Sequence, residues 1–417
     1  MNSKKVGWPV SPVMYAIGAL PQFKHDGDFF DWLYLSMRWL PLVRPLDMAV
    51  LPDLWPLREY VRFLEDVLHQ GSRLNILWVS AGHYVLDDAL DEDTGAQKKI
   101  RAFTELHDAL VVTYSSVSRR SAWFKNAVHE ERFCGESEEW CARFGSKEIL
   151  HPSALAPEVP SLAESMGVPV LRGYNASNTD ELLRALQLLS DQGIANVGIK
   201  PLSGVFGDGI VSLEGKALGE VRETLRAYQF PGGPVALEEW VKIDQDDHGE
   251  RSWSTHYLGN SLFGPPTRQL VSGRTSAGNI TPGFPENAAA LEDITARLIA
   301  AMSPKGMGGF NGPMVDGKPY MTDVNTGRLT GVCSSLAFRE LLAPGMVTLN
   351  RKLGKPMLGL RDAWQRLRSE GLAFDPSRGQ GVFLQGWIPS AWSQVIVAAG
   401  TRDEVVHMLQ HAKTALA

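Results

Sequence analysis

Four short motifs between residues 199 and 328 combine charged residues with glycines in an order that suits a nucleotide. The first is IKPLSGVFGDGI (199–210), in which Lys200 closes an apolar strand and three glycines, Gly204, Gly207 and Gly209, follow in a loop. Backbone N–H groups of such a loop can fold over phosphate oxygens, and a lysine on the preceding strand adds a point charge against the same group. The motif therefore predicts a loop that closes over a nucleotide.

Two better-known phosphate motifs do not fit this stretch. In a Walker A loop the lysine follows the glycines and opens a helix, whereas Lys200 precedes them and the chain returns to the strand IVSLEG (210–215). In a dinucleotide fingerprint G-x-G-x-x-G also leads into a helix, whereas the order here is G-x-x-G-x-G inside a hairpin. Taken alone, the stretch is equally compatible with a glycine-rich hairpin and a solvated lysine.

The next two motifs supply carboxylates. Glu238 and Glu239 end the apolar strand of VALEEWVKI (235–243), where one carboxylate can accept a hydrogen bond from an adenine amino group and the backbone near Val241 can pair with the ring edge. Glu250, after an acidic loop, is a candidate for the ribose hydroxyls. These residues predict recognition of a nucleoside.

The last motif, YMTDVNTGR (320–328), sets Asp323 and Asn325 two residues apart on a strand, so that both side chains point to one face. Two hard oxygen ligands on one face suit Mg²⁺, which keeps further positions for water and substrate phosphates. A turn is the alternative, because D-x-N at the end of a strand is a common turn signal.

A helix and a series of strands are expected to position these motifs. In NTDELLRALQLLSDQG (178–193), leucines recur on one helical face, Asn178 and Glu181 have capping-box spacing, and Gly193 ends the helix. The helix leads into the strand of Lys200, and the short alternating runs that follow predict an antiparallel sheet. The predicted fold class is therefore mixed α/β.

Three regions are predicted along the chain. The first contains the strand-like runs LNILWVS (74–80) and ALVVTYSS (109–116) among helical patterns, and the last contains two strands and a terminal helix. The predicted regions are an N-terminal α/β domain (1–145), a central domain (146–349) whose first part (about 146–235) is a lid, and a small C-terminal α/β cap (350–417).

Composition excludes some classes of function. The 417 residues include 41 Lys and Arg against 47 Asp and Glu, a net charge of −6 that offers no general attraction to nucleic acid or anionic lipid. The chain has three cysteines without CxxC spacing, no signal-like segment and no apolar run of about 18 residues. We expect a cytoplasmic protein without nucleic-acid or membrane partners.

The order of the motifs, K-P-x-x-G-x-x-G-x-G, then E-E-W-V, then G-E, then D-x-N-x-x-R, resembles the ATP-grasp superfamily. More closely, residues 146–342 resemble D-alanine–D-alanine ligases and related amino-acid and peptide ligases, including those of pheganomycin type. The resemblance implies an ATP-grasp fold, ATP and Mg²⁺ as cofactors, and carboxylate and amine substrates. A homodimer is compatible with it. The first 145 residues carry no motif of this kind.

Carried over position by position, the resemblance implies the following sites. The nucleotide ligands would be Lys147, Lys200, Gly204, Gly207, Gly209, Glu238, Glu239, Val241 and Glu250. The metal ligands would be Asp323, Asn325 and, a strand earlier, Asn311, with Asp316 in the next turn as the alternative; the family usually has Glu where Asp323 stands. In RQLVSGRTSAGN (268–279), Arg274 would face the γ-phosphate with Arg268 as its neighbour, and Arg328 would hold an acyl phosphate or a substrate carboxylate.

The function implied is an ATP-dependent ligase that joins a carboxylate, expected to be that of an amino acid, to an amine through an acyl phosphate. The architecture favours a stand-alone amino-acid ligase of specialised metabolism that makes a dipeptide antimetabolite of the tabtoxin kind. The alternatives are a ligase for longer peptides, an ATP-grasp kinase or carboxylase, and a regulatory nucleotide-binding protein without catalysis.

Overall fold

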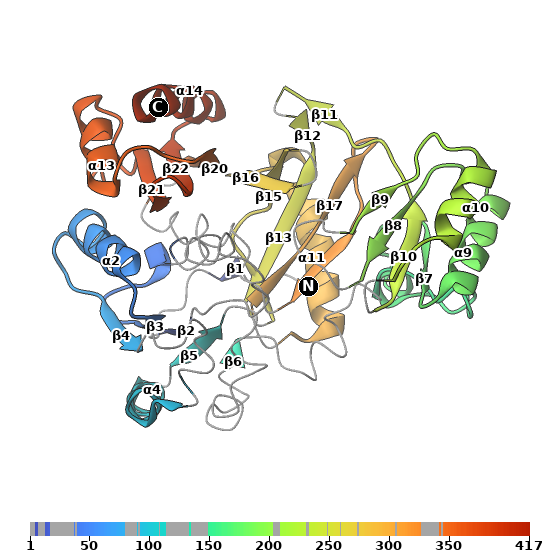
Figure 1. Cartoon of the computed structure of the whole chain (residues 1–417), viewed down its shortest axis with the longest axis horizontal. Helices are drawn as coiled ribbons and strands as arrows, with labels where there is room; N and C mark the ends of the chain where they lie inside the picture. The colour runs from blue at the N-terminus through green and yellow to red at the C-terminus, as the bar shows by residue number, and fades with distance from the viewer. Residues whose placement is uncertain are drawn as a thin grey trace.

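The computed structural model describes most of the central and C-terminal parts of the chain and some of the N-terminal part (Figure 1). Its described residues are 5–6, 13–16, 37, 40–79, 90, 92–107, 109–113, 133–134, 149–202, 209–230, 233–247, 249–258, 260–272, 275–304, 307–326, 342 and 345–417.

The N-terminal part forms a five-stranded parallel sheet in the order β4-β3-β2-β5-β6. Parallel strands need crossover connections, and the amphipathic helix α2 supplies one of them between β3 and β4. The predicted strands at 74–80 and 109–116 are confirmed as β4 and β5. The elements are η1 (Leu40–Leu42), β2 (Val13–Ala16), β3 (Met48–Pro52), α2 (Trp55–Val67), β4 (Asn75–Val79), α4 (Thr94–His107), β5 (Leu110–Thr113) and β6 (Phe133–Cys134).

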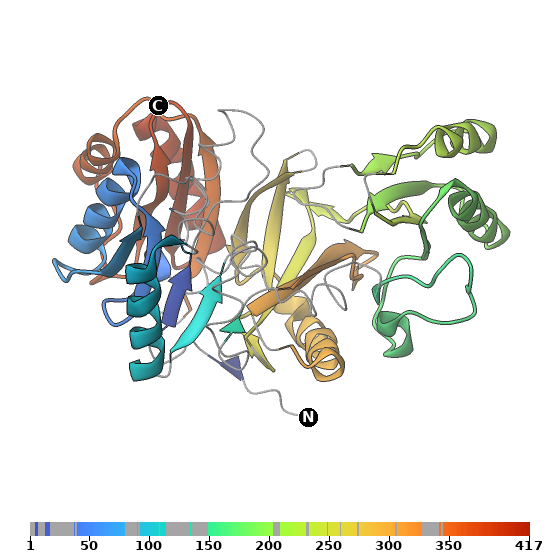
Figure 2. The ribbon, with the colours of Figure 1, turned by 60° about the horizontal axis from the view of Figure 1, so that its bottom comes forward.

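The segment predicted to be a lid (about 146–235) contains most of a four-stranded antiparallel sheet, β7-β10-β8-β9, with α9 and α10 on one face (Figure 2). We call this part the lid, after that prediction. The predicted helix is confirmed as α9, because the Asn178 side chain accepts from Glu181 N and Gly193 takes a positive φ of 78°. The Glu181 carboxylate accepts from Ser177 N rather than from Asn178 N. The elements are α8 (Leu162–Ser165), β7 (Gly173–Ala176), α9 (Thr179–Asp191), β8 (Val197–Pro201), β9 (Val211–Ser212), α10 (Leu218–Arg226) and β10 (Val235–Glu239).

A large sheet lies beside the lid and includes the C-terminal strands (Figure 2). Its main order is β1-β14-β13-β15-β16-β20-β22-β21, and β17 adds a branch by pairing with β13, β18 and β19. Its strands are β1 (Lys5–Val6), β13 (Ser252–Leu258), β14 (Ser261–Phe263), β15 (Thr267–Ser272), β16 (Thr275–Thr281), β17 (Met307–Val315), β18 (Lys318–Pro319), β19 (Asp323–Thr326), β20 (Val347–Gly354), β21 (Gly381–Ile388) and β22 (Trp392–Ala399).

Strand β20 links the predicted cap to the central sheet. It pairs with β16 on one side and with β22 on the other, so the boundary predicted after residue 349 falls inside a strand. Helices α13 (Leu360–Ser369) and α14 (Arg402–Leu416) pack on the C-terminal strands, and η4 (Pro285–Asn287) and α11 (Ala288–Met302) follow β16. The C-terminal segment therefore extends the same sheet that carries the candidate metal residues.

The apolar cores explain how the parts are joined. One core combines residues of α2, in the N-terminal part of the chain, with residues of β20, β21, β22, α13 and α14. The same two parts are joined by the buried Tyr60 hydroxyl of α2, which donates to Leu384 O of β21 at 2.9 Å. A second core lies between α11 and the strands β13 and β17, and a third lies inside the lid. Of the helices in the described residues, none is long and apolar enough to span a bilayer.

His256, on β13, gives a testable pH dependence of stability. It is buried, and burial lowers its pKa from 6.5 to about 3. The unfolded chain therefore binds this proton near pH 6.5 and the folded protein does not, so acid favours unfolding. The contribution of neutral His256 to the free energy of unfolding is complete above pH 6.5. Below pH 6.5 it falls by about 1.4 kcal/mol per pH unit.

We expect wild type to lose about 2 kcal/mol more unfolding free energy than His256→Asn between pH 6.5 and about pH 5. Urea unfolding curves at the two pH values measure both losses. Equal losses in the two proteins would contradict this assignment.

Candidate active site

Two of the sequence-predicted residues meet where the lid sheet approaches the large sheet. Lys200 lies on β8, and its Nζ is 3.2 Å from Asp323 Oδ1 on β19. The same Nζ donates to Thr322 O. Lys200 is buried and Asp323 is only partly exposed, so this ion pair is shielded from water and salt. The structure thus brings the predicted phosphate lysine and a predicted metal ligand together from segments over 100 residues apart.

Glu238 lies on the same face of the lid sheet as Lys200, because Ala236 is opposite Lys200 and residues two apart on β10 share a face. Its carboxylate Oε2 is 3.0 Å from His151 Nε2. A carboxylate only accepts, so Nε2 carries the proton in this contact. His151 was not among the residues predicted from the sequence, since an isolated histidine in GSKEILHPS carries no motif.

Glycines on both neighbouring strands leave space around Glu238. Gly173 on β7 and Gly198 on β8 are its direct partners across the sheet. A Cβ at Gly173 would lie 2.8 Å from His151 Cε1 and 3.0 Å from Glu238 Cβ. A Cβ at Gly198 would lie 2.4 Å from a ring carbon of Trp240. The two glycines therefore permit the histidine contact on one side and the packing of the tryptophan on the other.

The charges of this group reinforce one another. Burial alone would lower the pKa of Lys200, but the Asp323 and Glu238 carboxylates outweigh burial and raise it. Burial alone would raise the pKa of Glu238, but the Lys200 charge and the His151 hydrogen bond outweigh burial and lower it. Lys200 is therefore held as a cation and Glu238 as an anion, the forms that phosphate and an adenine amine respectively require.

The three predicted metal residues lie side by side on β17 and β19. Asn311 is directly opposite Asp323 in the sheet, and Asn311 Nδ2 donates to Asp323 Oδ2 at 3.0 Å. Asn325 Nδ2 donates to Asn311 Oδ1 at 2.6 Å, so the predicted common face of Asp323 and Asn325 is observed. Asp316 instead lies in the exposed turn between β17 and β18, where its N–H donates to Asp244 Oδ1 at 2.9 Å. The geometry favours Asn311 over Asp316.

Glu239 and Val241 differ in what their backbones offer. Glu239 N donates to Arg172 O at 2.8 Å, and Glu239 Oε1 accepts from Arg172 N at 2.9 Å. The backbone N–H of Glu239 is therefore not available to an adenine ring, although Glu239 was predicted to contribute a backbone contact there. Trp240 N donates to Asn196 O. Within the described residues, the Val241 N–H has no hydrogen-bond partner, so Val241 is the hinge donor left for a ligand.

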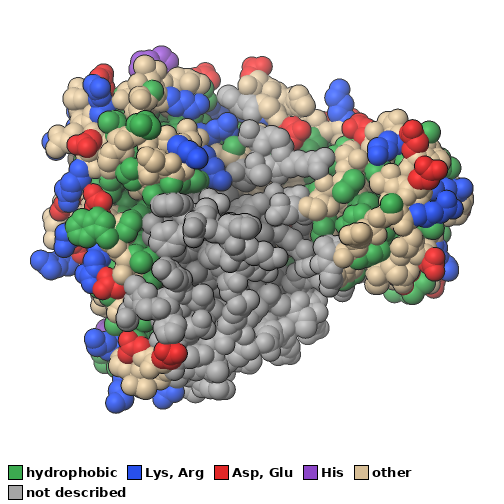
Figure 3. All heavy atoms as spheres, viewed as in Figure 1, with side chains coloured by type: hydrophobic (Ala, Val, Ile, Leu, Met, Phe, Trp, Pro, Cys, Tyr) green, Lys and Arg blue, Asp and Glu red, His purple; other side chains and the backbone are tan. Residues whose placement is uncertain are grey.

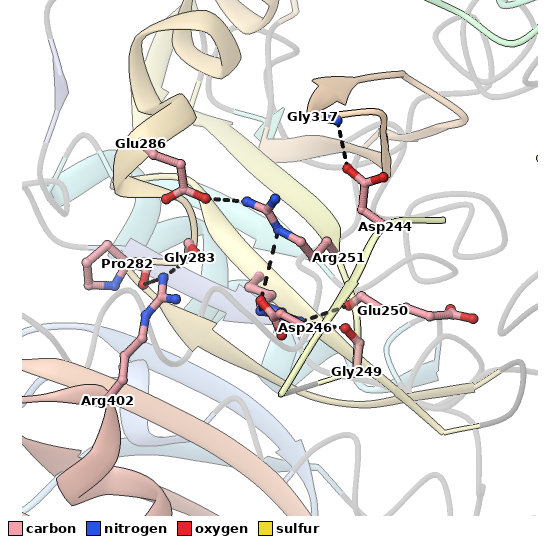
Figure 4. Close-up of polar contacts among 11 residues, drawn as sticks. Asp244, Asp246, Gly249, Glu250, Arg251, Pro282, Gly283, Glu286, Gly317 and Arg402 are labelled. Atoms are coloured by element: carbon pink, nitrogen blue, oxygen red, sulfur yellow. Dashed lines mark hydrogen bonds and ion pairs between the residues drawn. The ribbon is translucent and has the colours of Figure 1, made fainter. Parts of the chain in front are cut away.

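Glu250 lies on a separate hairpin, β11 (Gln245–Asp246) and β12 (Gly249–Glu250). Its side chain extends away from the neighbouring charged residues Asp246 and Arg251 (Figure 4). Arg268 was predicted to neighbour the γ-phosphate arginine. It is instead 1% exposed and its guanidinium pairs with Asp246 beneath this hairpin. Because the Arg268 guanidinium is itself buried and already pairs with the exposed Asp246, it is not available to a phosphate in this structure.

Other predicted residues fall outside the described part of the chain: Lys147, Gly204, Gly207, Arg274 and Arg328. Their roles stay predictions. Gly209, the last glycine of the loop, is described and has a positive φ of 76°, and a Cβ there would lie 2.8 Å from Pro201 Cγ. A residue with a side chain would be strained at this position.

Polar side chains continue from the metal residues across one face of the large sheet. Residues that face each other in a sheet lie on the same side, and so do residues two apart. The register carries this polar face from Asn311 through β13, β15 and β16 to β20. Its buried members on these four strands include Ser254, Thr267, Asn279 and Asn350. The opposite face carries apolar residues such as Phe310, Ile280 and Leu349.

The His151 contact can be tested by nucleotide binding. His151→Leu should weaken ATP binding about tenfold or more, because a hydrogen bond to a charged group contributes about 1.5–3 kcal/mol and Glu238 would lose its fixed orientation. Isothermal titration with ATP measures the change. His411→Leu, an exposed histidine on α14, is the matched control. Unchanged ATP affinity in His151→Leu would show that the contact has only a structural role.

Comparison of sequences gives little about activity. No protein-family model matches the chain. A curated protein from Methanocaldococcus jannaschii, named uncharacterized protein MJ0776, is 24% identical over 186 residues, which are 44% of this chain and 44% of that protein. The chain thus spans less than half the length of this relative.

Comparison of structures shows the fold. The chain is similar to biotin carboxylase from Campylobacter jejuni, in a β,γ-ATP complex (TM-score 0.58, 12% identity, 98% of this chain and 92% of that one). It is similar to the MgADP- and bicarbonate-bound biotin carboxylase domain of 2-oxoglutarate carboxylase from Hydrogenobacter thermophilus (0.56, 14%, 97% and 90%). It is also similar to N5-carboxyaminoimidazole synthase from Aspergillus clavatus, with ADP and 5-aminoimidazole ribonucleotide (0.54, 10%, 97% and 98%). The chain therefore has the ATP-grasp fold, as the sequence predicted.

Proposed function

We propose that this chain, which has the ATP-grasp fold, is an ATP-dependent ligase that activates a carboxylate and transfers it to an amine. The observation that carries the proposal is the convergence of Lys200 from the lid with Asp323 from the large sheet. A phosphoryl-transfer site needs a fixed cation beside oxygen ligands for a metal, and these two residues bring both functions within 3.2 Å.

In this proposal the nucleotide lies between the lid and the large sheet. Lys200 binds the α- and β-phosphates, and the loop that ends at Gly209 closes over them. Glu238, oriented by His151, accepts from the adenine amine, and the Val241 N–H donates to the ring edge. Glu250 binds the ribose hydroxyls.

The residues on β17 and β19 fit Mg²⁺ by the chemistry of their donors. Asn311, Asp323 and Asn325 offer one carboxylate and two amide oxygens, all hard ligands, and Asn311 is hydrogen-bonded to both of the others. In the described residues no group of three His, Cys, Asp or Glu side chains suited to a metal occurs, and Asp323 is the one carboxylate of this set. When bound with ATP, Mg²⁺ would neutralise charge that develops on the phosphates.

The reaction then follows from charge. A carboxylate oxygen attacks the γ-phosphorus and ADP leaves, which gives an acyl phosphate. Lys200 reduces the repulsion between the two anions, and its raised pKa keeps it protonated at neutral pH. The amine attacks the acyl carbon, phosphate leaves with the bonding electron pair, and the amine proton passes to water or phosphate. Closure of the glycine loop protects the acyl phosphate from hydrolysis.

The polar face of the large sheet is where we expect the substrates to lie. It starts at Asn311 and carries mainly hydroxyl and amide side chains up to Asn350, together with the buried imidazole of His256. Such a surface suits hydrogen-bonding substrates such as amino acids or short peptides rather than apolar ones. On the described part of the face drawn in Figure 3, acidic and basic side chains are interspersed, which also favours small substrates over polyanions. A dipeptide-forming role in specialised metabolism is the finer form of this proposal.

A second candidate is carboxylation, in which bicarbonate takes the place of the amino-acid carboxylate. It is favoured by the solved structures that resemble this chain over nearly its whole length, because one of them binds bicarbonate and another binds 5-aminoimidazole ribonucleotide. The phosphoryl-transfer step would be the same. The two candidates differ only in the acid that is activated.

The experiment is measurement of ADP and phosphate release with ATP and Mg²⁺, with single and paired amino acids and with ¹³C-bicarbonate plus amines. Mass spectrometry identifies the products, and Lys200→Met is the control for contaminating ATPases. Release that needs an amino-acid pair, with a product lighter than their sum by one water, supports the amide ligase. Incorporation of ¹³C supports the carboxylase. ATP binding without any release would contradict both.

A further inference from the structure

We propose that Arg268 is a positioning residue for the nucleotide, because it fixes the hairpin from which Glu250 reaches the ribose hydroxyls. This inference rests on the proposed function and assigns a role to a residue that the sequence analysis named only as the neighbour of Arg274. Arg268 itself does not touch the nucleotide. It acts through the hairpin β11–β12.

The Arg268 guanidinium makes its contacts from below the hairpin. One nitrogen, Nη1, donates to Asp246 Oδ2, and Nη2 donates to Asp246 Oδ1 at 2.6 Å. The same Nη2 donates to Gly249 O at 2.8 Å and approaches Glu250 O at 3.3 Å. One buried side chain on β15 therefore contacts both strands of the hairpin and the backbone of Glu250 itself.

The hairpin needs such an anchor. Its strands have two residues each and pair only with one another, and an isolated pair of short strands is marginal in water. Its two ends are held separately (Figure 4). The Asp244 carboxylate accepts from Asp316 N at 2.9 Å and Gly317 N at 2.8 Å, and Arg251 pairs with Glu286. Between these ends, the buried Arg268 binds residues of both strands, and Arg251 Nε also lies 4.0 Å from Asp246 Oδ2.

The position of β15 beneath the hairpin is fixed in turn by close packing. Gly283 lies against the backbone of Arg268, where a Cβ would be only 2.0 Å from Arg268 N. Arg402, from α14, donates to Gly283 O, which ties this loop to the C-terminal helix (Figure 4). The base of the anchor is therefore rigid, as a positioning residue requires.

Glu250 is placed to use this support. Among the described residues its carboxylate accepts no hydrogen bond, and the side chain extends away from the Arg251–Asp246 contacts (Figure 4). Because Arg268 holds the carbonyl of the same residue, it fixes the peptide plane and with it the direction in which the side chain leaves the backbone. A lysine could not replace Arg268, since a single ammonium group lacks the planar fork that pairs with both Asp246 oxygens.

The test compares ATP with 2′-deoxy-ATP and 3′-deoxy-ATP, because ribose recognition is the property that the hairpin would control. The variants are Asp246→Asn, at an exposed position, Arg268→Lys, Glu250→Gln, and the double variant Asp246→Asn/Glu250→Gln. Asp66→Asn, which removes the exposed ion pair with Arg361, is the matched control. Isothermal titration gives each affinity, and circular dichroism confirms folding.

We expect wild type to prefer ATP over the deoxy nucleotides by about tenfold, Glu250→Gln to lose this preference, and Asp246→Asn and Arg268→Lys to lose most of it. The double variant should match Glu250→Gln, because both changes remove one function. A full preference in folded Asp246→Asn, or equal weakening of all three nucleotides, would overturn the inference. If wild-type protein binds no ATP, the proposed function itself fails, which is a different result.

Discussion

Lys200→Met is expected to reduce kcat/KM for ATP by about 10²- to 10³-fold or more, the usual cost of removing a preorganised charge from a phosphoryl-transfer site. Lys200 is buried, and its pKa is raised by Asp323 and Glu238 although burial opposes this. Methionine has a similar length but no charge, so the γ-phosphoryl transfer would lose its fixed cation. Initial rates of ADP release over a range of ATP concentrations measure the effect.

The same substitution also removes the counter-charge of two carboxylates. Glu238 and Asp323 would then repel one another, and the pKa of Glu238 should rise because its largest stabilising partner is gone. A loss of folding is separated from a loss of catalysis by thermal unfolding and by Lys200→Arg, which keeps a cation. Lys216→Met, in an exposed turn of the lid, is the control. A folded Lys200→Met variant with wild-type kcat/KM would refute the phosphate role.

Asp323→Ala is expected to lower kcat of the Mg²⁺-dependent reaction at least about 10²-fold. The activity that remains should need a higher Mg²⁺ concentration than the wild type. Asp323 is the one carboxylate among the three candidate ligands, and it also contacts Lys200 and Asn311. Its loss removes the charge that would attract the cation. Turnover measured against Mg²⁺ concentration separates weakened metal binding from a general loss of activity.

Asp316→Asn is the matched control for this prediction, because Asp316 was the alternative metal carboxylate and lies exposed in a turn. The variant should keep wild-type turnover and the wild-type Mg²⁺ requirement. An inactive, folded Asp316→Asn variant would show that Asp316 rather than Asn311 completes the metal site. Unchanged product formation by Asp323→Ala alone would exclude the metal site on β19.

Some elements of the site could be read from the sequence because their signals are local. Side chains two apart on a strand share a face, so the pairing of Asp323 with Asn325 followed from spacing. The helix at 178–193 followed from its leucine spacing and its end residues, which act within one turn. The fold class followed from the order of several such local signals.

Other elements depend on contacts between distant segments, which spacing does not encode. His151 reaches Glu238 because β7 places Gly173 between them without a side chain. Arg268 has the residue type of a phosphate ligand, and its binding to Asp246 depends on where a later strand lies beneath an earlier hairpin. A single residue of a common type gives no sign of such a partner.

The sequence by itself determined the alternation of the strands, the placement of the glycines and the order of the nucleotide motifs, because these are properties of neighbouring residues. Only the tertiary structure decided that Asn311 rather than Asp316 adjoins Asp323, that the C-terminal strands extend the central sheet, and that Lys200 and Asp323 meet. The physical reason is that strand register and buried charge pairs arise between segments far apart in the chain, where the free energy of packing selects the partner.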